Sequence, residues 1–252
     1  MATFVIIHGA WGGGWEWSHV ADIMRGHGHH VFTPTLTGMG ERAHLLVGDP
    51  VGLGTHVDDI VAVLELEDLR DVVLAGASYG GLAATGAAGR APERVRLLVY
   101  IDGLVPIDGQ PPIATFPEAF AASVRDGVAR YGPAWRVPMP EGLFEDLLPA
   151  GSVSEAVRAS YRERIRDHPA ATFIEPIHLS AAAEAVPRAY IRCTAAGYAE
   201  RMGGDPVAIA AERARAAGWT YREIAVGHDP QVFDPEGIAR LLTDLAAEGS
   251  RV

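Results

Sequence analysis

A buried strand that runs directly into a glycine-flanked serine constrains this chain more than any other feature. Residues 72–77 are Val-Val-Leu-Ala-Gly-Ala, residues 76–80 are Gly-Ala-Ser-Tyr-Gly, and small side chains dominate residues 82–88. A chain with 29 glycines can contain G-x-S-x-G by chance, so the strand before the motif and the helix after it carry the prediction. On such a strand-to-helix turn a serine hydroxyl is exposed above the sheet. The stretch therefore predicts a nucleophile elbow with Ser78 as the nucleophile.

The rest of the chain alternates between strand and helix patterns. This alternation favours a single α/β core with a mostly parallel, doubly wound sheet, whose functional groups gather at the carboxyl ends of the strands. Apolar runs predict strands at 3–7, 30–33, 96–101, 189–193 and 219–225, and helical spacing predicts helices at 15–24, 56–66, 206–217 and 235–247.

One long stretch departs from this alternation. Residues 106–186 contain many prolines, alanine-rich helical patterns and scattered aromatic residues. We interpret this stretch as a helical cap inserted into a core domain formed by residues 1–105 and 187–252.

A histidine follows the last predicted strand, in the sequence Gly227-His228-Asp229. The carboxyl ends of parallel strands meet at one edge of a sheet, so His228 can reach Ser78 although 150 positions separate them. A histidine in that position can take the serine proton as a general base and return it to the leaving group. We therefore expect His228 to be the catalytic base.

Two backbone amides are candidates for an oxyanion hole. The glycine-rich loop after the strand 3–7 can supply one amide, at Ala10, and the residue that follows the nucleophile supplies the other, at Tyr79. A phosphate-binding loop is a weak alternative, because no G-x-G-x-x-G leads into a helix with a suitably spaced acidic residue.

The composition excludes several classes of function. A net charge of -11 disfavours nucleic acid and anionic membrane surfaces as partners. All 21 basic residues are arginine, which excludes Schiff-base and P-loop chemistry. Histidines 27, 29 and 30 lack neighbouring carboxylates or cysteines, so we expect no metal site. The lone Cys193 permits no internal disulfide, and the apolar run 4–7 is too short for a signal peptide, so we expect a cytoplasmic protein.

Four motifs together resemble the α/β-hydrolase superfamily. They are F-V-I-I-H-G-A-W-G-G-G-W near the start, V-V-L-A-G-A-S-Y-G-G at the elbow, V-Y-I-D-G-L-V-P before the cap, and G-H-D-P near the end. Along nearly its whole length the chain is similar to bacterial esterases related to plant methylesterases and hydroxynitrile lyases, and to pyrethroid-cleaving carboxylesterases. This resemblance implies the α/β-hydrolase fold with its cap, a cofactor-free mechanism and an ester-like substrate.

The chain also departs from these relatives. Hydroxynitrile lyases of the group carry a threonine and a lysine where this chain has Gly9 and Asp229, so cyanohydrin cleavage is not expected. The plant relatives place the third catalytic residue, an aspartate, where this chain has Ala196. Other α/β-hydrolases take the acid from the strand after the nucleophile helix, where Asp102 lies. We therefore predict Asp102 as the acid; Glu200 and Asp205 are the alternatives, and a purely structural role for Asp102 in an Asp-Gly turn also stays open.

These observations predict a serine esterase with a Ser78, His228 and Asp102 triad, acting on a mostly apolar small-molecule ester. Two alternatives stay open. One is a non-hydrolytic enzyme of the same fold, a lyase or a cyclase or tailoring enzyme of secondary metabolism, that uses the same serine and histidine. The other is an inactive hydrolase fold that acts as a ligand receptor. The sequence leaves a homodimer open.

Overall fold

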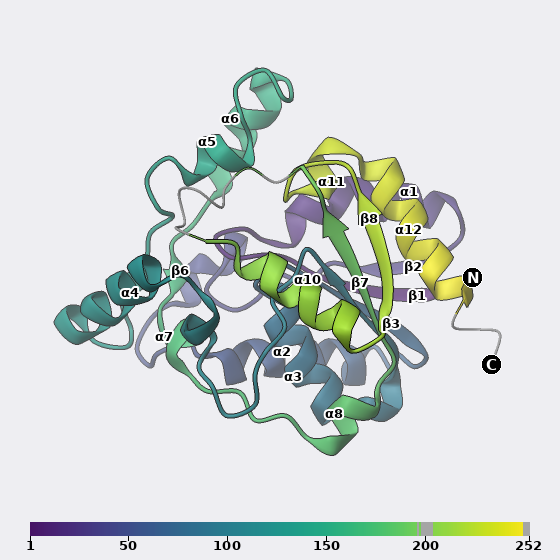
Figure 1. The fold of residues 1–252 in the computed structure, drawn as a ribbon, viewed down its shortest axis with the longest axis horizontal. Helices are drawn as coiled ribbons and strands as arrows, with labels where there is room; N and C mark the ends of the chain where they lie inside the picture. The colour runs from purple at the N-terminus through teal and green to yellow at the C-terminus, as the bar shows by residue number, and fades with distance from the viewer. Residues whose placement is uncertain (196, 198–203, 249–252) are drawn as a thin grey trace.

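The computed structural model describes residues 1–195, 197 and 204–248. Within them, six strands form the central sheet in the order β2-β1-β3-β4-β7-β8 (Figure 1). Every neighbouring pair of these strands is parallel. The strands are β1 (Thr3–Ile7), β2 (His30–Phe32), β3 (Val72–Ala77), β4 (Val95–Ile101), β7 (Arg188–Cys193) and β8 (Thr220–Ile224). The predicted strands and the parallel α/β class are confirmed.

The strand order reverses next to β1, which lies between β2 and β3. In an open parallel sheet, ligands bind outside the carboxyl ends of the strands at such a reversal. The loops that leave β1 and β3 contain Ala10 and Ser78, so two of the predicted site residues lie beside this switch point.

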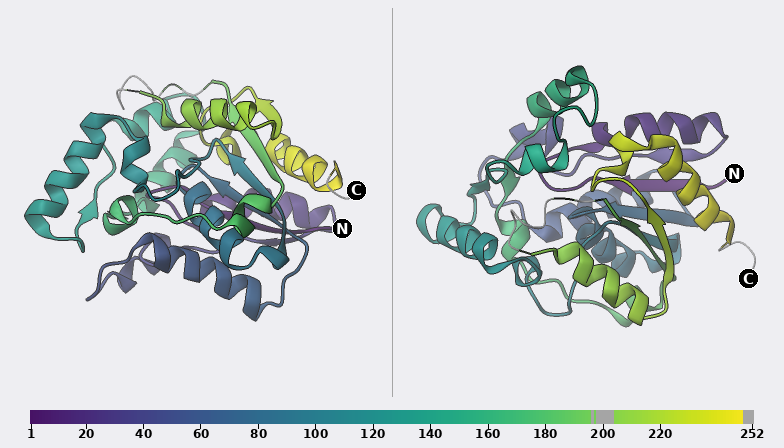
Figure 2. Two further views of the ribbon diagram at one scale, coloured as in Figure 1. Left: turned by 60° about the horizontal axis from the view of Figure 1, so that its bottom comes forward. Right: turned by 45° about the horizontal axis from the view of Figure 1, so that its top comes forward.

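Two apolar layers cover the sheet, because successive side chains of a strand point to opposite faces. Phe4 and Ile6 of β1 pack with Trp17 and the helices α1 (Ser18–Gly26) and α12 (Pro235–Glu248). Val5 and Ile7 of the same strand pack in the second cluster, with α2 (Leu53–Leu66), α3 (Gly80–Arg90) and α10 (Pro206–Ala216). The two further views in Figure 2 show the sheet between these helices. Continuous apolar strands are thus explained by burial on both faces.

Residues 118–174 of the segment between β4 and β7 lie at one end of the molecule, beyond the carboxyl edge of the sheet (Figures 1 and 2), whereas residues 181–185 pack against α3. All of residues 106–186 are described, and none of them adds a strand to the six-stranded sheet. The segment is not purely helical, since β5 (Arg136–Val137) pairs antiparallel with β6 (His168–Pro169). Its helices are α4 (Glu118–Tyr131), α5 (Leu143–Leu147), α6 (Glu155–Arg164), α7 (Ala171–Ile174) and α8 (Ala181–Ala185), with the short 3-10 turn η4 (Pro112–Thr115).

Short 3-10 turns lie in three of the connections between the main elements. The helix predicted at 15–24 begins as η1 (Gly14–Trp17) and continues as α1, and the connection from β2 to α2 contains η2 (Gly40–Leu45). A third turn, η3 (Pro92–Arg94), leads from α3 into β4. No helix among the described residues combines the length and the apolar character that crossing a bilayer requires.

Candidate active site

The turn between β3 and α3 holds Ser78 in a strained conformation. The backbone of Ser78 has φ of +50°, in a region that residues other than glycine seldom occupy. Its amide donates to the carbonyl of Ile101 (3.1 Å), and its carbonyl accepts from the amide of Leu104 (2.9 Å). These bonds fix the turn to the end of β4 and hold the strained serine in place.

Two flanking glycines make this turn sterically possible. A Cβ at Gly76 would lie 2.5 Å from the carbonyl oxygen of Gly80. A Cβ at Gly80 would lie 2.6 Å from the carbonyl oxygens of both Ile7 and His8. Because backbone atoms fill both spaces, neither position tolerates a side chain without movement of the chain. The G-x-S-x-G spacing thus has the physical reason that the sequence predicted.

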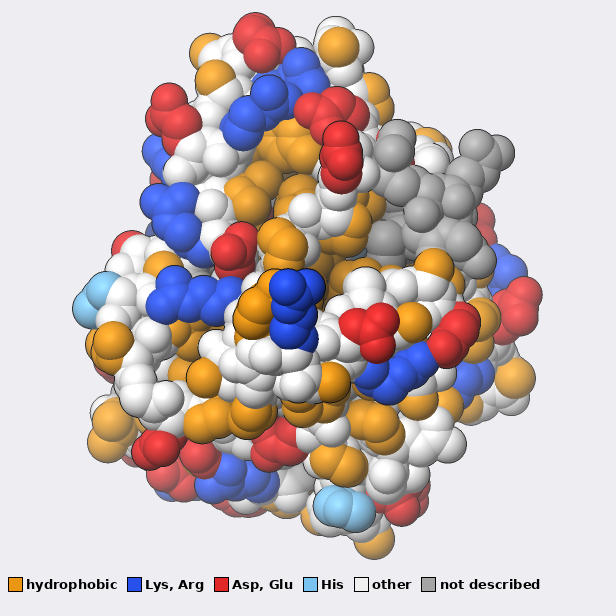
Figure 3. Space-filling model, turned by 90° about the vertical axis from the view of Figure 1, so that its left-hand side faces the viewer, with side chains coloured by type: hydrophobic (Ala, Val, Ile, Leu, Met, Phe, Trp, Pro, Cys, Tyr) orange, Lys and Arg blue, Asp and Glu red, His pale blue; other side chains and the backbone are white. Residues whose placement is uncertain are grey.

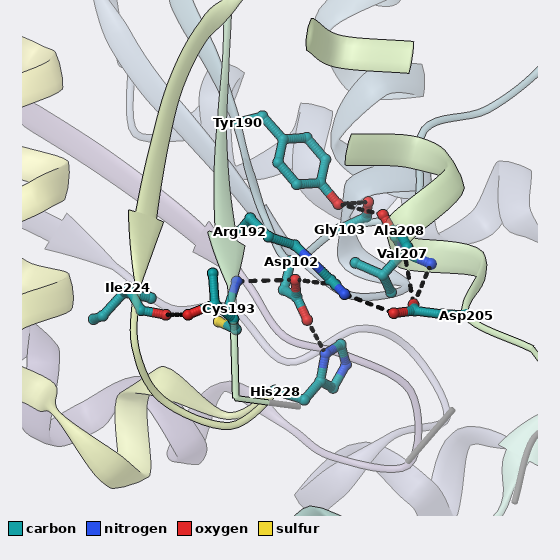
Figure 4. Close-up of polar contacts among 11 residues, drawn as sticks. Asp102, Gly103, Tyr190, Arg192, Cys193, Asp205, Val207, Ala208, Ile224 and His228 are labelled. Carbon is teal, nitrogen blue, oxygen red and sulfur yellow. Dashed lines mark hydrogen bonds and ion pairs between the residues drawn. The ribbon is translucent and has the colours of Figure 1, made fainter. Parts of the chain in front are cut away.

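His228 contacts Asp102 at the carboxyl edge of the sheet (Figure 4). Nδ1 of His228 lies 2.6 Å from Oδ2 of Asp102, and the aspartate is fully buried. A carboxylate only accepts, so Nδ1 carries the hydrogen. With the hydrogen on Nδ1, the other ring nitrogen, Nε2, is the one that can accept a proton from a serine hydroxyl. The structure therefore brings together two residues that lie 126 positions apart.

A second set of bonds holds the other oxygen of Asp102. Oδ1 accepts from Nη1 of Arg192 (2.7 Å) and from the amide of Cys193 (3.1 Å). Arg192 also donates from Nη2 to Asp205 (2.6 Å), whose other oxygen accepts from the first amides of α10. Figure 4 shows this chain of contacts from α10 to the histidine. Asp205 thus binds Arg192 and caps α10, while Glu200 lies outside the described residues.

The environment of His228 acts on its pKa in two directions. Burial, the largest influence, lowers the pKa, because a charged ring loses hydration. The hydrogen bond to Asp102, the charge of Asp102 and the charge of Asp229 raise it, and the net pKa lies above the ordinary value of 6.5. The protonated ring that a general base forms is therefore stabilised at this position.

Ser78 and His228 open onto one cavity between the sheet edge and the cap. Gly9 and Ala10 of the loop after β1 line the same cavity. A Cβ at Gly9 would lie 3.2 Å from Cβ of Ser78, so the absence of a side chain keeps the space beside the serine open. Neither the amide of Ala10 nor that of Tyr79 donates a hydrogen bond to a residue that the structure describes. Both amides are thus available to a ligand.

The cap gives this cavity a largely apolar wall. Figure 3 shows a hollow lined by hydrophobic side chains on the side of the molecule that carries the cap helices. The apolar residues that line the cavity are Trp11, Ala77, Leu104, Phe116, Met139, Leu143, Phe144, Leu147, Leu148, Ile165, Pro206 and Val207.

A buried group of polar aromatic residues lies beneath the elbow, and no pattern in the sequence indicated it. The hydroxyl of Tyr79 is 2.8 Å from Nδ1 of His56, and the Tyr79 ring packs against His168 with centroids 4.5 Å apart. Burial lowers the pKa of both His8 and His56 to about 4. These histidines are neutral structural residues. Among the described residues, no set of three or more His, Cys, Asp or Glu side chains is arranged to hold a metal ion.

The parallel sheet, the strained serine turn and the inserted cap define an α/β-hydrolase. The chain belongs to the alpha/beta hydrolase family, whose model matches residues 4–241. It is 35% identical over 254 residues to a carbendazim hydrolyzing esterase from Nocardioides sp. (strain SG-4G), covering 97% of this chain and 100% of that protein. It is also 31% identical to methylesterase 9 of Arabidopsis thaliana, over 50% of this chain and 49% of that protein.

Solved structures with low sequence identity share the fold. One is an extracellular α/β-hydrolase from a Paenibacillus species, with a TM-score of 0.77 and 23% identity, covering 97% of this chain and 98% of that one. Another is a pyrethroid hydrolase from Sphingobium faniae JZ-2, with a TM-score of 0.70 and 20% identity, covering 100% of this chain and 99% of that one. The predicted resemblance and fold are confirmed.

Proposed function

We propose that this α/β-hydrolase cleaves the carboxylic ester bond of a mostly apolar small molecule through an acyl-enzyme on Ser78. The observation that carries the proposal is one cavity onto which a strained serine and an aspartate-bound histidine both open. The esterase class is supported by the full-length relative from Nocardioides, which is named as an esterase. The non-hydrolytic enzyme and the inactive receptor have no comparable support.

The first half of the reaction forms the acyl-enzyme. Oγ of Ser78 attacks the ester carbonyl carbon while Nε2 of His228 takes the hydroxyl proton. The amides of Ala10 and Tyr79 donate to the negative oxygen of the tetrahedral intermediate, each contributing about 3 kcal/mol to the transition state. The C–O bond to the alcohol then breaks, and the imidazolium gives its proton to the leaving alkoxide.

The second half returns the free enzyme. A water molecule gives a proton to His228 and attacks the acyl carbon, and the bond to Ser78 breaks as the serine takes the proton back. Asp102 holds the tautomer and orientation of His228 in both halves. The apolar cavity wall selects a substrate with an extended apolar body, because such a body gains by leaving water.

Labelling with a fluorophosphonate tests this scheme. The reagent forms a covalent bond with an activated serine, so intact mass and peptide mapping should show one adduct on Ser78. Ser78→Ala should lose both the adduct and the turnover of p-nitrophenyl esters. Ser152→Ala, an exposed serine in the cap, is the matched control and should keep both.

Two acid variants separate the candidates for the third residue. Labelling that slows in Asp102→Asn and not in Glu200→Gln would support Asp102, and the reverse would support Glu200. A parent protein that forms no adduct would refute the serine hydrolase and favour the lyase or receptor alternative. The cytoplasmic location stays a prediction from the sequence, as does the lack of nucleic-acid and membrane partners. The sequence leaves a homodimer open.

A further inference from the structure

Three oxygen acceptors lie together in the wall of the cavity, and the mechanism uses none of them. They belong to Glu16 of η1, to Asp229, and to Gln231 of the short helix α11 (Pro230–Phe233). The turn η1 packs against α11, which brings residues 213 positions apart in the sequence to one place. We call this group the acceptor end of the cavity.

Glu16 occupies space that only a glycine leaves free. A Cβ at Gly12 would lie 2.2 and 2.3 Å from the two carboxylate oxygens of Glu16, so the carboxylate rests directly on the Gly12 backbone. Burial, and then the charge of Asp229, raise the pKa of Glu16 well above its ordinary value, while a hydrogen bond with the Gly13 backbone lowers it. The two carboxylates thus repel each other in a poorly hydrated place.

Gln231 adds an acceptor without a partner. Its side chain is 5% exposed, and Nε2 donates to Oδ1 of Asp229 (3.1 Å). That bond fixes the orientation of the amide, because a carboxylate oxygen accepts and the amide nitrogen donates. Oε1 is therefore the free end, and it has no hydrogen-bond partner among the described residues. Gln231 therefore adds to the residues that line the cavity a buried carbonyl oxygen whose hydrogen-bonding capacity no described residue uses.

Positive groups are scarce in the same wall. Among the described residues that line the cavity there is no arginine, and the ring of His228 is engaged by Asp102. Tyr161 brings one hydroxyl, and burial, followed by the charges of Glu16 and Asp229, raises its pKa so that it stays neutral. Among the described residues of this wall, the protein therefore provides no guanidinium to balance Glu16 and Asp229, whose raised pKa values show that a negative charge is costly there.

We propose that the acceptor end binds a protonated nitrogen of the substrate, so that the preferred ester combines an apolar body with a basic amine. This inference rests on the proposed esterase function. A protonated amine donates hydrogen bonds to Glu16 and Asp229 and offsets their repulsion. An apolar environment strengthens this charge pairing relative to water.

Two esters of the same shape test the proposal. Methyl 4-(dimethylaminomethyl)benzoate carries a protonated nitrogen at neutral pH, and methyl 4-isobutylbenzoate has a carbon in the same place. The quantity measured is the ratio of kcat/KM for the amine ester to kcat/KM for the isobutyl ester. We expect the parent to favour the amine ester by about tenfold or more, as a charge-assisted hydrogen bond would give.

Single substitutions locate the preference. Glu16→Gln keeps the shape and removes the charge, and it should reduce the ratio by about tenfold. Glu67→Gln, an exposed glutamate at the end of α2, is the matched control and should keep the ratio of the parent. If the parent turns over neither ester, protection of Ser78 from fluorophosphonate by N,N-dimethylbenzylamine, compared with isobutylbenzene, gives the same ratio.

The outcomes separate this inference from the proposed function. A ratio near one in the parent, or an unchanged ratio in Glu16→Gln, overturns the amine preference while the labelled Ser78 keeps the esterase. The same ratio in the parent and in Glu16→Gln would mean that Glu16 and Asp229 share a proton with each other and do not bind a cation. Absence of the Ser78 adduct would overturn the esterase, and the inference with it.

Discussion

Arg192 holds the oxygen of Asp102 that His228 does not use. Nη1 of Arg192 lies 2.7 Å from Oδ1, and Nδ1 of His228 lies 2.6 Å from Oδ2. The buried carboxylate is thus balanced by a cation on one side and by an imidazole on the other. Its orientation depends on the position of β7, which carries Arg192.

The two aspartates bound to Arg192 should differ sharply in their effect on activity. Asp102→Asn removes the charge that stabilises the imidazolium and allows the wrong tautomer, so kcat/KM should fall by about 10³- to 10⁴-fold. Asp205→Asn, the matched control, keeps an oxygen that can cap α10 and does not change the contact with His228. Steady-state kinetics on one ester measure both variants. Similar losses in the two would contradict the assigned role of Asp102.

Removing the charge of Arg192 should change the pH profile. The positive charge of Arg192 lowers the pKa of His228. Arg192→Gln should therefore raise that pKa, and the acidic limb of kcat/KM should move to higher pH, because the ring must be neutral to accept the serine proton. Loss of the only guanidinium bound to the buried Asp102 among the described residues should also reduce the free energy of unfolding by about 3 kcal/mol.

A neighbouring arginine controls for the loss of an ion pair. Arg222 lies on β8 and pairs with Glu248 in a partly exposed position. Arg222→Gln should cost less than about 1 kcal/mol and leave the pH profile of the parent. An active Arg192→Gln variant with an unshifted acidic limb would show that Arg192 does not act on His228.

His56 should contribute to the loss of stability in acid. Burial lowers the pKa of folded His56 to about 4, against an ordinary value of 6.5. Below that ordinary value the unfolded chain binds a proton that the folded chain does not, so this contribution to stability is present above about pH 6.5 and is lost as the pH falls toward 4. At about pH 5 the loss amounts to about 2 kcal/mol.

Urea unfolding at about pH 7.5 and about pH 5 measures this term. His56→Gln lacks the titrating group, so its free energy of unfolding should fall by about 2 kcal/mol less than that of the parent between these conditions. His19→Gln, an exposed histidine on α1, should keep the dependence of the parent. Equal dependence in all three proteins would show that His56 does not contribute to the loss of stability in acid.

Gly80, two residues after the nucleophile, should not tolerate even a methyl group. In Gly80→Ala the new Cβ would lie 2.6 Å from two backbone carbonyl oxygens, so the elbow must move. We expect a loss of about 3 kcal/mol in stability and a large loss of turnover. Gly26→Ala, at the end of α1 with nothing within 4 Å of the new Cβ, should be neutral or stabilise by up to about 1 kcal/mol. Thermal unfolding compares the two, and equal stability would contradict the steric argument.

The features that depend on local pattern could be predicted from the residues alone. The strand 72–77, the turn at Ser78 and the alternation of strands with helices follow from residue spacing and from glycine geometry, which act over a few residues. The position of His228 after the last strand could also be predicted, because parallel strands place their carboxyl ends at one edge. The choice of Asp102 depended on its place at the end of a strand and on the resemblance to known hydrolases.

The pairing of distant side chains depends on the fold and could not be predicted from local pattern. Arg192 meets Asp102 because β7 lies beside β4 in a particular register, and no local pattern encodes that register. Glu16 joins Asp229 and Gln231 because η1 packs against α11, and the free Oε1 of Gln231 depends on one hydrogen bond. The side chain of Tyr79 lies in the core with His56, although its neighbour Ser78 faces the cavity. Such pairings depend on the packing of whole elements, whose geometry is fixed by many weak contacts at once.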